Sequence, residues 1–158
     1  MNKLKDVAPC SLCCYTCPSY KNGVIKQSID NLVKYYDGYP EFLHQNLPRK
    51  YKKYAKKTEK FVEYIQNEHT SCGGCRGEKN CNCSIANCFI LDCTKQHGID
   101  FCGECENFPC DKAKTFFKGI VLDDYLKGNE RIKKVGKEKF AEEITLKSHY
   151  ASYKSNGK

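Results

Sequence analysis

The chain has 158 residues, with 27 lysine and arginine residues against 19 acidic ones, so its formal net charge is +8. This length suits one domain around one hydrophobic core. No apolar stretch approaches the roughly 18 residues that span a membrane, and the opening MNKLKDVAPC lacks the apolar segment of a secretory signal. We therefore expect a cytoplasmic protein with no membrane partner.

Cysteine dominates the composition, with thirteen residues in the chain. Such a share is typical of folds held together by disulfides in secreted proteins or by metal–thiolate bonds inside cells. The odd count and the absence of a signal favour thiolates. A zinc ion with four thiolates carries about −2, so two or three sites would reduce the net charge to about +4 or +2. The basic composition is therefore weak evidence for nucleic acid.

The first predicted element is a cysteine-rich loop over residues 8–22, which holds four cysteines within eight positions. Among them, Cys10, Cys14 and Cys17 have the C-x3-C-x2-C spacing of radical S-adenosylmethionine enzymes, which bind an iron–sulfur cluster. Those enzymes need much of a β/α barrel, for which this chain lacks both the length and the repeated strand–helix units. The sequence therefore disfavours a radical enzyme.

Residues 24–68 contain no cysteine and are predicted to form two helices. A first apolar stripe at helical spacing ends in a break at residues 37–40, and Pro48 suits the first turn of the second helix. We interpret both stripes as core-packing faces and the lysines opposite as a solvated face, with phosphate contact as the weaker alternative. The stripes are Ile25, Ile29, Leu32, Val33 and Tyr36, then Tyr51, Tyr54, Ala55, Thr58, Phe61, Val62 and Ile65.

The long segment 70–110 holds nine cysteines and shows little periodicity. A loop of this length cannot offset its ordering entropy by burial alone, so we expect metal sites to cross-link it. The pattern becomes helical over residues 109–152, with breaks expected at Gly128 and Gly136 and a last helix reaching Tyr150.

The predicted fold is mainly helical with little or no sheet. We expect a single cysteine-rich domain over residues 1–152, in which metal sites attach the loops at 8–22 and 70–110 to a helical frame. A polar tail over residues 153–158 is expected to be disordered.

The spacing C-x-x-C supplies two zinc ligands from one tight turn. It occurs at 72–75 and 102–105 with an internal glycine, and at 10–13 and 14–17 without one. Twelve ligands would make three four-cysteine sites and leave over one cysteine, Cys13 or Cys81. The spacing does not decide how the cysteines group, and iron–sulfur ligation uses the same thiolates.

Several blocks of the chain resemble the DUF3795 family of small cysteine-rich proteins. They are CSLCCYTCPSY at 10–20, CGGCRG at 72–77, the run from Cys88 to Cys110, and a weak C-terminal block at 131–138. The chain differs where Ser11 replaces the usual glycine and Cys13 is added. The resemblance implies zinc binding through Cys10, Cys14, Cys17, Cys72, Cys75, Cys88, Cys93, Cys102, Cys105 and Cys110. We add Cys83 as a further ligand and regard Cys81 and Cys13 as the least certain.

The sequence therefore predicts a zinc-binding protein with two to three zinc ions per chain, a structural or interaction role and no assigned reaction. One alternative is an iron–sulfur redox protein or small metalloenzyme, with an open site at Cys10, Cys14 and Cys17. Another is the sensing or delivery of a soft metal. The partner would be a protein or a nucleic acid. We interpret His97 and Glu104, which lie near cysteines, as exposed loop residues.

Overall fold

The structure is a computed structural model that describes residues 3–69, 71–77, 88–148 and 150–153. These residues are mainly helical and form no sheet, which confirms the predicted fold class. Two isolated β-bridges pair Val7 with Cys13 and Tyr20 with Cys72. None of the described helices combines the length and apolar character that crossing a bilayer requires.

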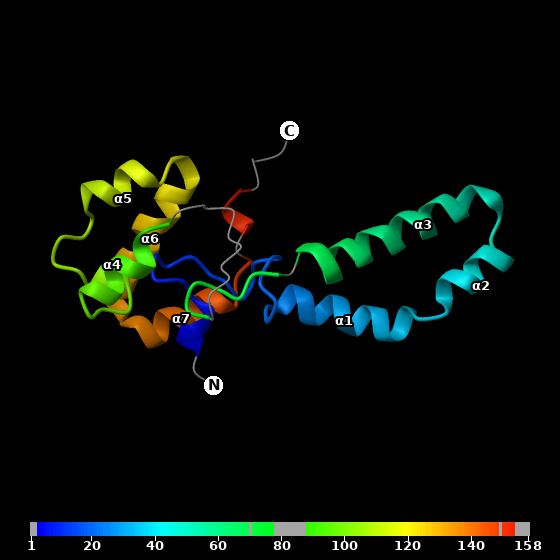
Figure 1. The fold of residues 1–158 in the computed structure, drawn as a ribbon, viewed down its shortest axis with the longest axis horizontal. Helices are drawn as coiled ribbons and strands as arrows, with labels where there is room; N and C mark the ends of the chain where they lie inside the picture. The colour runs from blue at the N-terminus through cyan, green and yellow to red at the C-terminus, as the bar shows by residue number, and fades with distance from the viewer. Residues whose placement is uncertain (1–2, 70, 78–87, 149, 154–158) are drawn as a thin grey trace.

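A helical arm projects from the rest of the molecule (Figure 1). It consists of α1 (Val24–Tyr36), α2 (Tyr39–Asn46), α3 (Arg49–Glu63) and the π-helical segment η2 (Tyr64–His69). The helix α2 was not predicted, because Gly38 and Pro40 were read only as a break. Gly38 turns the chain with φ +75°, and Pro40 lies in the first turn of α2, where a proline does not disrupt the helix.

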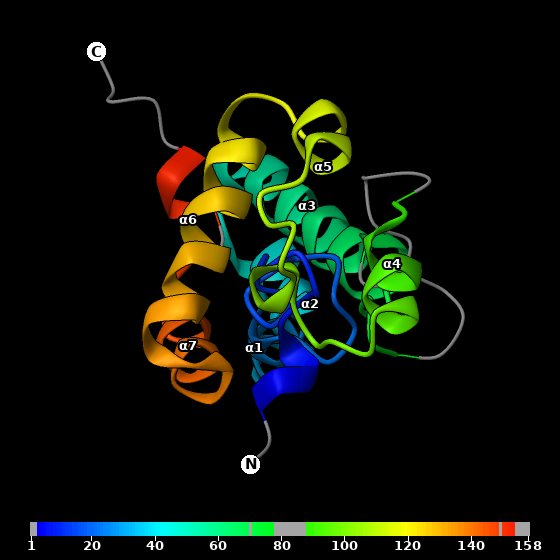
Figure 2. The ribbon, with the colours of Figure 1, turned by 90° about the vertical axis from the view of Figure 1, so that its left-hand side faces the viewer.

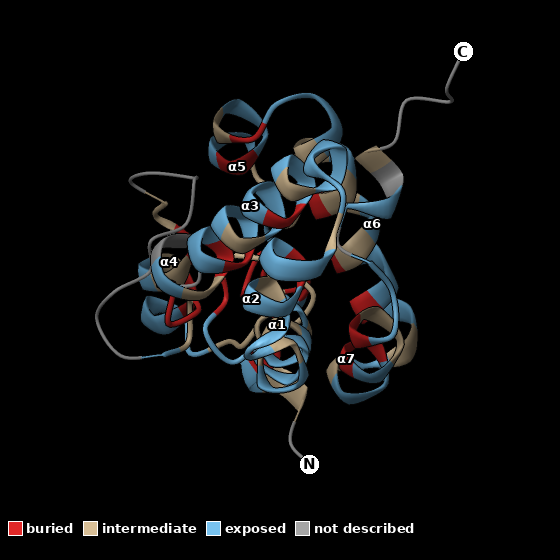
Figure 3. Cartoon of the chain, turned by 90° about the vertical axis from the view of Figure 1, so that its right-hand side faces the viewer, coloured by how far each residue is buried: buried red, intermediate tan, exposed pale blue. Residues whose placement is uncertain are grey.

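The interpretation of both apolar stripes as core-packing faces is wrong for much of the arm. Buried side chains in the arm are Leu43, Ala55, Val62 and Ile65, and α1 has none. Figure 3 shows most of α3 as exposed. Ile25, Leu32, Tyr51, Tyr54 and Phe61 are exposed. Periodicity places residues on one face of a helix, but it does not show whether another element covers that face.

The remaining elements form a body that packs around the N-terminal loop (Figure 2). They are η1 (Lys3–Asp6), α4 (Ile90–Gln96), η3 (Cys102–Glu104), α5 (Asp111–Phe116), α6 (Gly119–Val135), α7 (Lys137–Thr145) and η4 (Ala151–Tyr153). The helix α4 lies within the segment predicted to be a loop. Gly136 ends α6 as predicted, with φ +83°, whereas Gly128 lies inside α6 and does not break it. The last helix ends at Thr145, short of Tyr150.

The core of the body consists of two clusters of buried side chains. One joins cysteines to apolar residues: Ala8, Cys10, Ile90, Cys102, Ala113, Phe117 and Tyr125. The other consists of Val7, Phe101, Ile132, Phe140 and Ala141. The body therefore places thiols at its centre. The polar tail beyond Tyr153 lies outside the described residues, and the prediction of a single domain remains untested.

Candidate metal centre

The first cysteine loop folds back on itself so that neighbouring cysteines face different parts of the body. Its turns are closed by hydrogen bonds from the Cys14 N–H to the Asp6 carbonyl at 2.9 Å and from the Ser11 N–H to the Ala8 carbonyl at 2.8 Å. Ser11 takes the left-handed conformation with φ +71°. As a result, Cys10 lies in the mixed cysteine core, whereas Cys13 lines a different pocket.

Four cysteines line one small cavity of about 30 Å³. Cys93 comes from α4, Cys102 from η3, Cys105 from the residue after η3, and Cys110 from the residue before α5. The rest of the cavity wall is mainly apolar and aromatic, with Thr94 from α4 and Tyr125 from α6. A cavity of this volume has room for one small bound group.

The Cys102–Cys105 segment has the tight turn that its C-x-x-C spacing predicts. The Cys105 N–H donates to the Cys102 carbonyl at 3.1 Å, and the Cys102 N–H donates to the Pro9 carbonyl at 3.0 Å. The second bond joins the turn to the first cysteine loop, about ninety residues earlier in the chain. The backbone thus connects the two cysteine-rich segments without relying on a sulfur.

A second set of sulfurs gathers beside Cys10. The charges of Cys75, Cys88 and Cys102 lie close enough to raise the pKa of the Cys10 thiol, after the larger effect of burial. Cys14, Cys75 and Cys88 also pack against the core cluster that contains both Cys10 and Cys102. The structure therefore brings one cysteine from CSLCC together with CGGC and with the start of the third cysteine block.

Burial strongly raises the pKa of one thiol in each of the two sets. It raises the pKa of Cys10 well above its usual range and that of Cys102 to about 12, although a hydrogen bond with Tyr125 partly offsets the effect on Cys102. Burial also raises the pKa of Tyr125, as does the neighbouring Cys102. A buried thiol therefore stays protonated unless a cation balances its thiolate.

The chemistry of the donor set fits a thiophilic ion, because Zn²⁺ takes four thiolates in a tetrahedron. In the described parts of the chain, no three His, Cys, Asp or Glu side chains are already arranged to hold a metal ion. The cavity thus gathers the sulfurs of Cys93, Cys102, Cys105 and Cys110 without presetting a tetrahedron. No disulfide joins two of the eleven described cysteines.

Among the described residues, three further predicted ligands have other neighbours. Cys17 Sγ lies 3.6 Å from the hydroxyl of Tyr150, and Cys72 Sγ accepts a hydrogen bond from the Gly74 N–H at 3.4 Å. Cys13 lines a separate pocket of about 540 Å³ beside α6 and α7. Cys81 and Cys83 lie outside the described residues.

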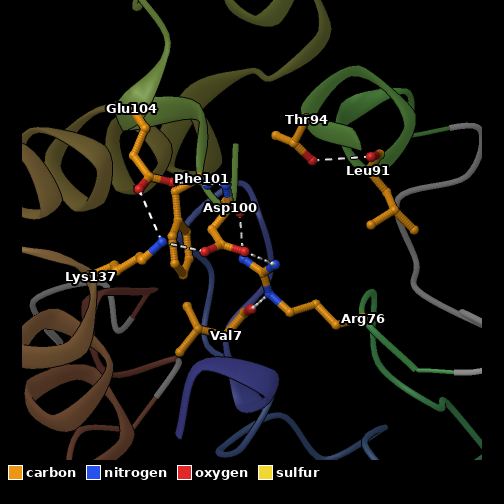
Figure 4. A network of polar contacts seen from close by, with 8 residues as sticks. All are labelled: Val7, Arg76, Leu91, Thr94, Asp100, Phe101, Glu104 and Lys137. Carbon is orange, nitrogen blue, oxygen red and sulfur yellow. Dashed lines mark hydrogen bonds and ion pairs between the residues drawn. The ribbon is translucent and has the colours of Figure 1, made fainter. Parts of the chain in front are cut away.

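A polar network fixes the loop around Cys102 (Figure 4). Arg76 Nε donates to the Val7 carbonyl at 2.8 Å, and its guanidinium lies 4.6 Å from the centre of the Phe101 ring. Asp100 forms ion pairs with Arg76 and Lys137. Arg76 directly follows Cys75, so the CGGCRG segment is held against the body through its arginine.

Glu104 is exposed, as expected, but it lies in η3 rather than in a loop, and its carboxylate holds backbone groups. Its Oε2 accepts hydrogen bonds from the backbone N–H groups of Asp100 at 2.9 Å and Phe101 at 2.8 Å. His97 is exposed as expected, and its Nδ1 lies 2.8 Å from the Cys93 carbonyl and 3.8 Å from Cys93 Sγ.

Sequence reasoning missed Asn129, a fully buried residue of α6. Its side-chain nitrogen donates to the Cys10 carbonyl at 3.2 Å, and its side-chain oxygen accepts from the Gly103 N–H at 2.7 Å. One amide thus bridges the first cysteine loop and the Cys102–Cys105 turn. A polar residue within the helical pattern of α6 was the available signal, but its partners are remote in sequence.

The fold and these contacts define a small helical, cysteine-rich protein whose thiols gather in its core. The model of the family "Protein of unknown function (DUF3795)" matches residues 6–115. The chain belongs to this family, which confirms the resemblance, although the match stops before the C-terminal block at 131–138. No curated protein and no solved structure matches the chain.

Proposed function

We propose that this protein is a cytoplasmic zinc-binding protein in which zinc–thiolate bonds attach cysteine-rich loops to a helical frame. The observation that carries the proposal is the convergence of Cys93, Cys102, Cys105 and Cys110 on one small cavity. These residues would hold one ion in a closed four-thiolate set, whose role is structural because no coordination position is left for a substrate. Thiolate ligands require a reducing compartment, which favours the cytoplasm.

Zinc binding would change the charge of this core. Burial raises the pKa of Cys102, so a bound Zn²⁺ would have to balance the thiolates and displace their protons. A four-thiolate zinc set keeps a net charge of about −2. Two positive charges lie beside the cavity wall, where they would partly balance this negative charge. They are the ammonium groups of Lys112 and Lys133, which lie 4.1 and 4.9 Å from the ring centres of Phe89 and Phe108.

A second ion would use the set around Cys10. The charges of Cys75, Cys88 and Cys102 act on Cys10, and Cys14, Cys75 and Cys88 pack against the core cluster that contains Cys10 and Cys102. Because Cys102 lines the first cavity, we assign Cys10, Cys14, Cys75 and Cys88 to the second ion. Cys17 and Cys72, together with Cys81 and Cys83, remain for a third ion. Two to three ions per chain would then connect segments that lie far apart in the sequence.

The test is the zinc content of anaerobically purified protein together with its absorption spectrum. We expect two to three zinc ions per chain and no visible band for the wild type. The variants Cys102→Ser and Cys10→Ser should each lose one ion, and the matched control Cys13→Ser should lose none. Cobalt bound to the wild-type protein should give the absorption of tetrahedral sulfur coordination, a readout that does not depend on whether the variants fold.

Other outcomes would contradict the proposal in distinct ways. Iron with acid-labile sulfide would establish an iron–sulfur protein. Weak, graded uptake of zinc or copper(I) would indicate metal sensing or delivery. Loss of an ion in Cys13→Ser would show that the grouping of the cysteines is wrong.

A further inference from the structure

The helix α3 carries an unusual concentration of positive charge on the projecting arm. Seven of its fifteen residues are basic and two are acidic. Within the described part of the chain, no lysine of α3 forms an ion pair with a carboxylate, whereas Lys114 and Lys137 of the body do. Glu59 faces His44 at 3.8 Å instead. The helix α3 therefore carries a formal net charge of +5.

Aromatic side chains lie among these lysines and remain open to solvent. Tyr51, Tyr54 and Phe61 are 44%, 56% and 57% exposed. Their spacing of three and seven residues places them along one side of the helix, over about 15 Å at 1.5 Å per residue. The ammonium groups of Lys50 and Lys53 lie 4.8 and 5.0 Å from the ring centres of Tyr51 and Tyr54. Two of the three rings thus have an ammonium group beside them.

Three kinds of environment could explain such a face. The rings are exposed and so do not pack in the core. Exposed apolar residues that gather in one patch mark a binding surface rather than a merely solvated face. The centres of protein–protein interfaces are enriched in aromatic residues but depleted in lysine. A flexible polyanion that offers both phosphates and flat bases matches both features, because base stacking on aromatic rings and lysine–phosphate contacts are how proteins bind single strands.

We propose that α3 binds single-stranded nucleic acid. The rings of Tyr51, Tyr54 and Phe61 stack on bases, and exposed lysines along the helix reach around it to contact phosphates. These lysines are Lys50, Lys53, Lys57 and Lys60, all of them exposed. Base faces and phosphates are shared by RNA and DNA, so binding does not discriminate between them. The proposal is independent of the zinc sites because α1, α2 and α3 contain no cysteine.

The experiment measures the anisotropy of a fluorescent twelve-nucleotide oligouridine, with oligothymidine and a duplex of the same length alongside. We compare wild type with a variant in which Lys50, Lys53, Lys57 and Lys60 are replaced by glutamine. The matched control replaces four exposed lysines of the body with glutamine, which changes the net charge by the same amount. These lysines are Lys95, Lys118, Lys134 and Lys139. Far-UV circular dichroism verifies that each variant is folded.

Four phosphate contacts predict a slope of about −2.8 in log affinity against log salt, so raising the salt from 50 to 200 mM should weaken binding about 50-fold. The α3 variant should lose this dependence, and the control should keep most of it. Tyr54→Ala and Phe61→Ala should each weaken binding at least about fivefold. Tyr35→Ala, which removes a ring 81% exposed on α1, should have little effect.

Several results would overturn the proposal. They are equal weakening by the α3 and control variants, equal affinity for the duplex, and no binding of the oligonucleotides at 50 mM salt. Equal binding of an oligoglutamate peptide would instead indicate an acidic protein partner for α3.

Discussion

The side-chain oxygen of Asn129 accepts a hydrogen bond from the backbone N–H of Gly103 at 2.7 Å, which joins the centre of α6 to the Cys102–Cys105 turn. The turn can approach this closely because residue 103 has no side chain. A Cβ there would lie 2.6 Å from the backbone oxygen of Asn129. The same amide also donates to Cys10 and to the Ser11 hydroxyl, so one residue aligns both cysteine-rich segments.

Asn129→Ala should destabilise the protein substantially. The change leaves at least the buried Gly103 N–H without its partner, and each such group costs about 1–3 kcal/mol. Urea unfolding of the metal-loaded protein measures the effect. Asn31→Ala, which changes an exposed residue of α1, should stay within about 0.5 kcal/mol. An equal effect of the two substitutions would show that the bridge is unimportant for stability.

Gly128→Ala should have opposite effects in two sequence backgrounds. A Cβ on Gly128 would lie 2.8 Å from the Cβ of Ser11 and closer still to its hydroxyl, so the change should cost about 1–3 kcal/mol through overpacking. In the Ser11→Gly background this clash disappears, and alanine within a helix is favoured over glycine by about 0.5–1 kcal/mol. A double-mutant cycle on unfolding free energy tests the reversal. The same loss in both backgrounds would contradict it.

Tyr125→Phe should weaken zinc binding without unfolding the protein. The hydroxyl of Tyr125 forms a hydrogen bond with Cys102, and losing a group that supports a metal ligand lowers affinity about 10- to 100-fold. Competition with a chromophoric chelator measures the zinc affinity. Tyr35→Phe, in an exposed part of α1, is the control. Unchanged affinity would mean that this hydroxyl does not support Cys102 as a zinc ligand.

The ion pair between Arg131 and Glu143 should give a pH-dependent contribution to stability. Its two contacts, Nε to Oε2 at 2.9 Å and Nη2 to Oε1 at 2.7 Å, lower the pKa of Glu143. The stabilisation should therefore be fully present above the ordinary glutamate pKa of about 4.3, and it should disappear as the pH falls through the lowered folded value. NMR titration of the Glu143 carboxyl should give a midpoint below 4.3 that rises toward it in Arg131→Gln. A midpoint unaffected by Arg131→Gln would contradict this prediction.

The helical stripes and the C-x-x-C turn at 102–105 were predictable because both depend on contacts between near neighbours in the chain. The helix α4 was missed because seven residues within a cysteine-rich segment give too short a pattern to recognise. The helix α2 was missed because Pro40 and Gly38 signal a break equally well before a helix and before a loop.

The sequence by itself determined the helical class, the abundance of thiols and the membership of the family, because periodicity, composition and motif spacing are local properties of the chain. Only the tertiary structure decided that Cys93, Cys102, Cys105 and Cys110 share one cavity, that Cys13 faces elsewhere and that Asn129 bridges the two cysteine-rich segments. It also decided that Tyr54 and Phe61 are exposed. These outcomes depend on which distant segments pack together, and the spacing of residues along a chain does not specify that packing.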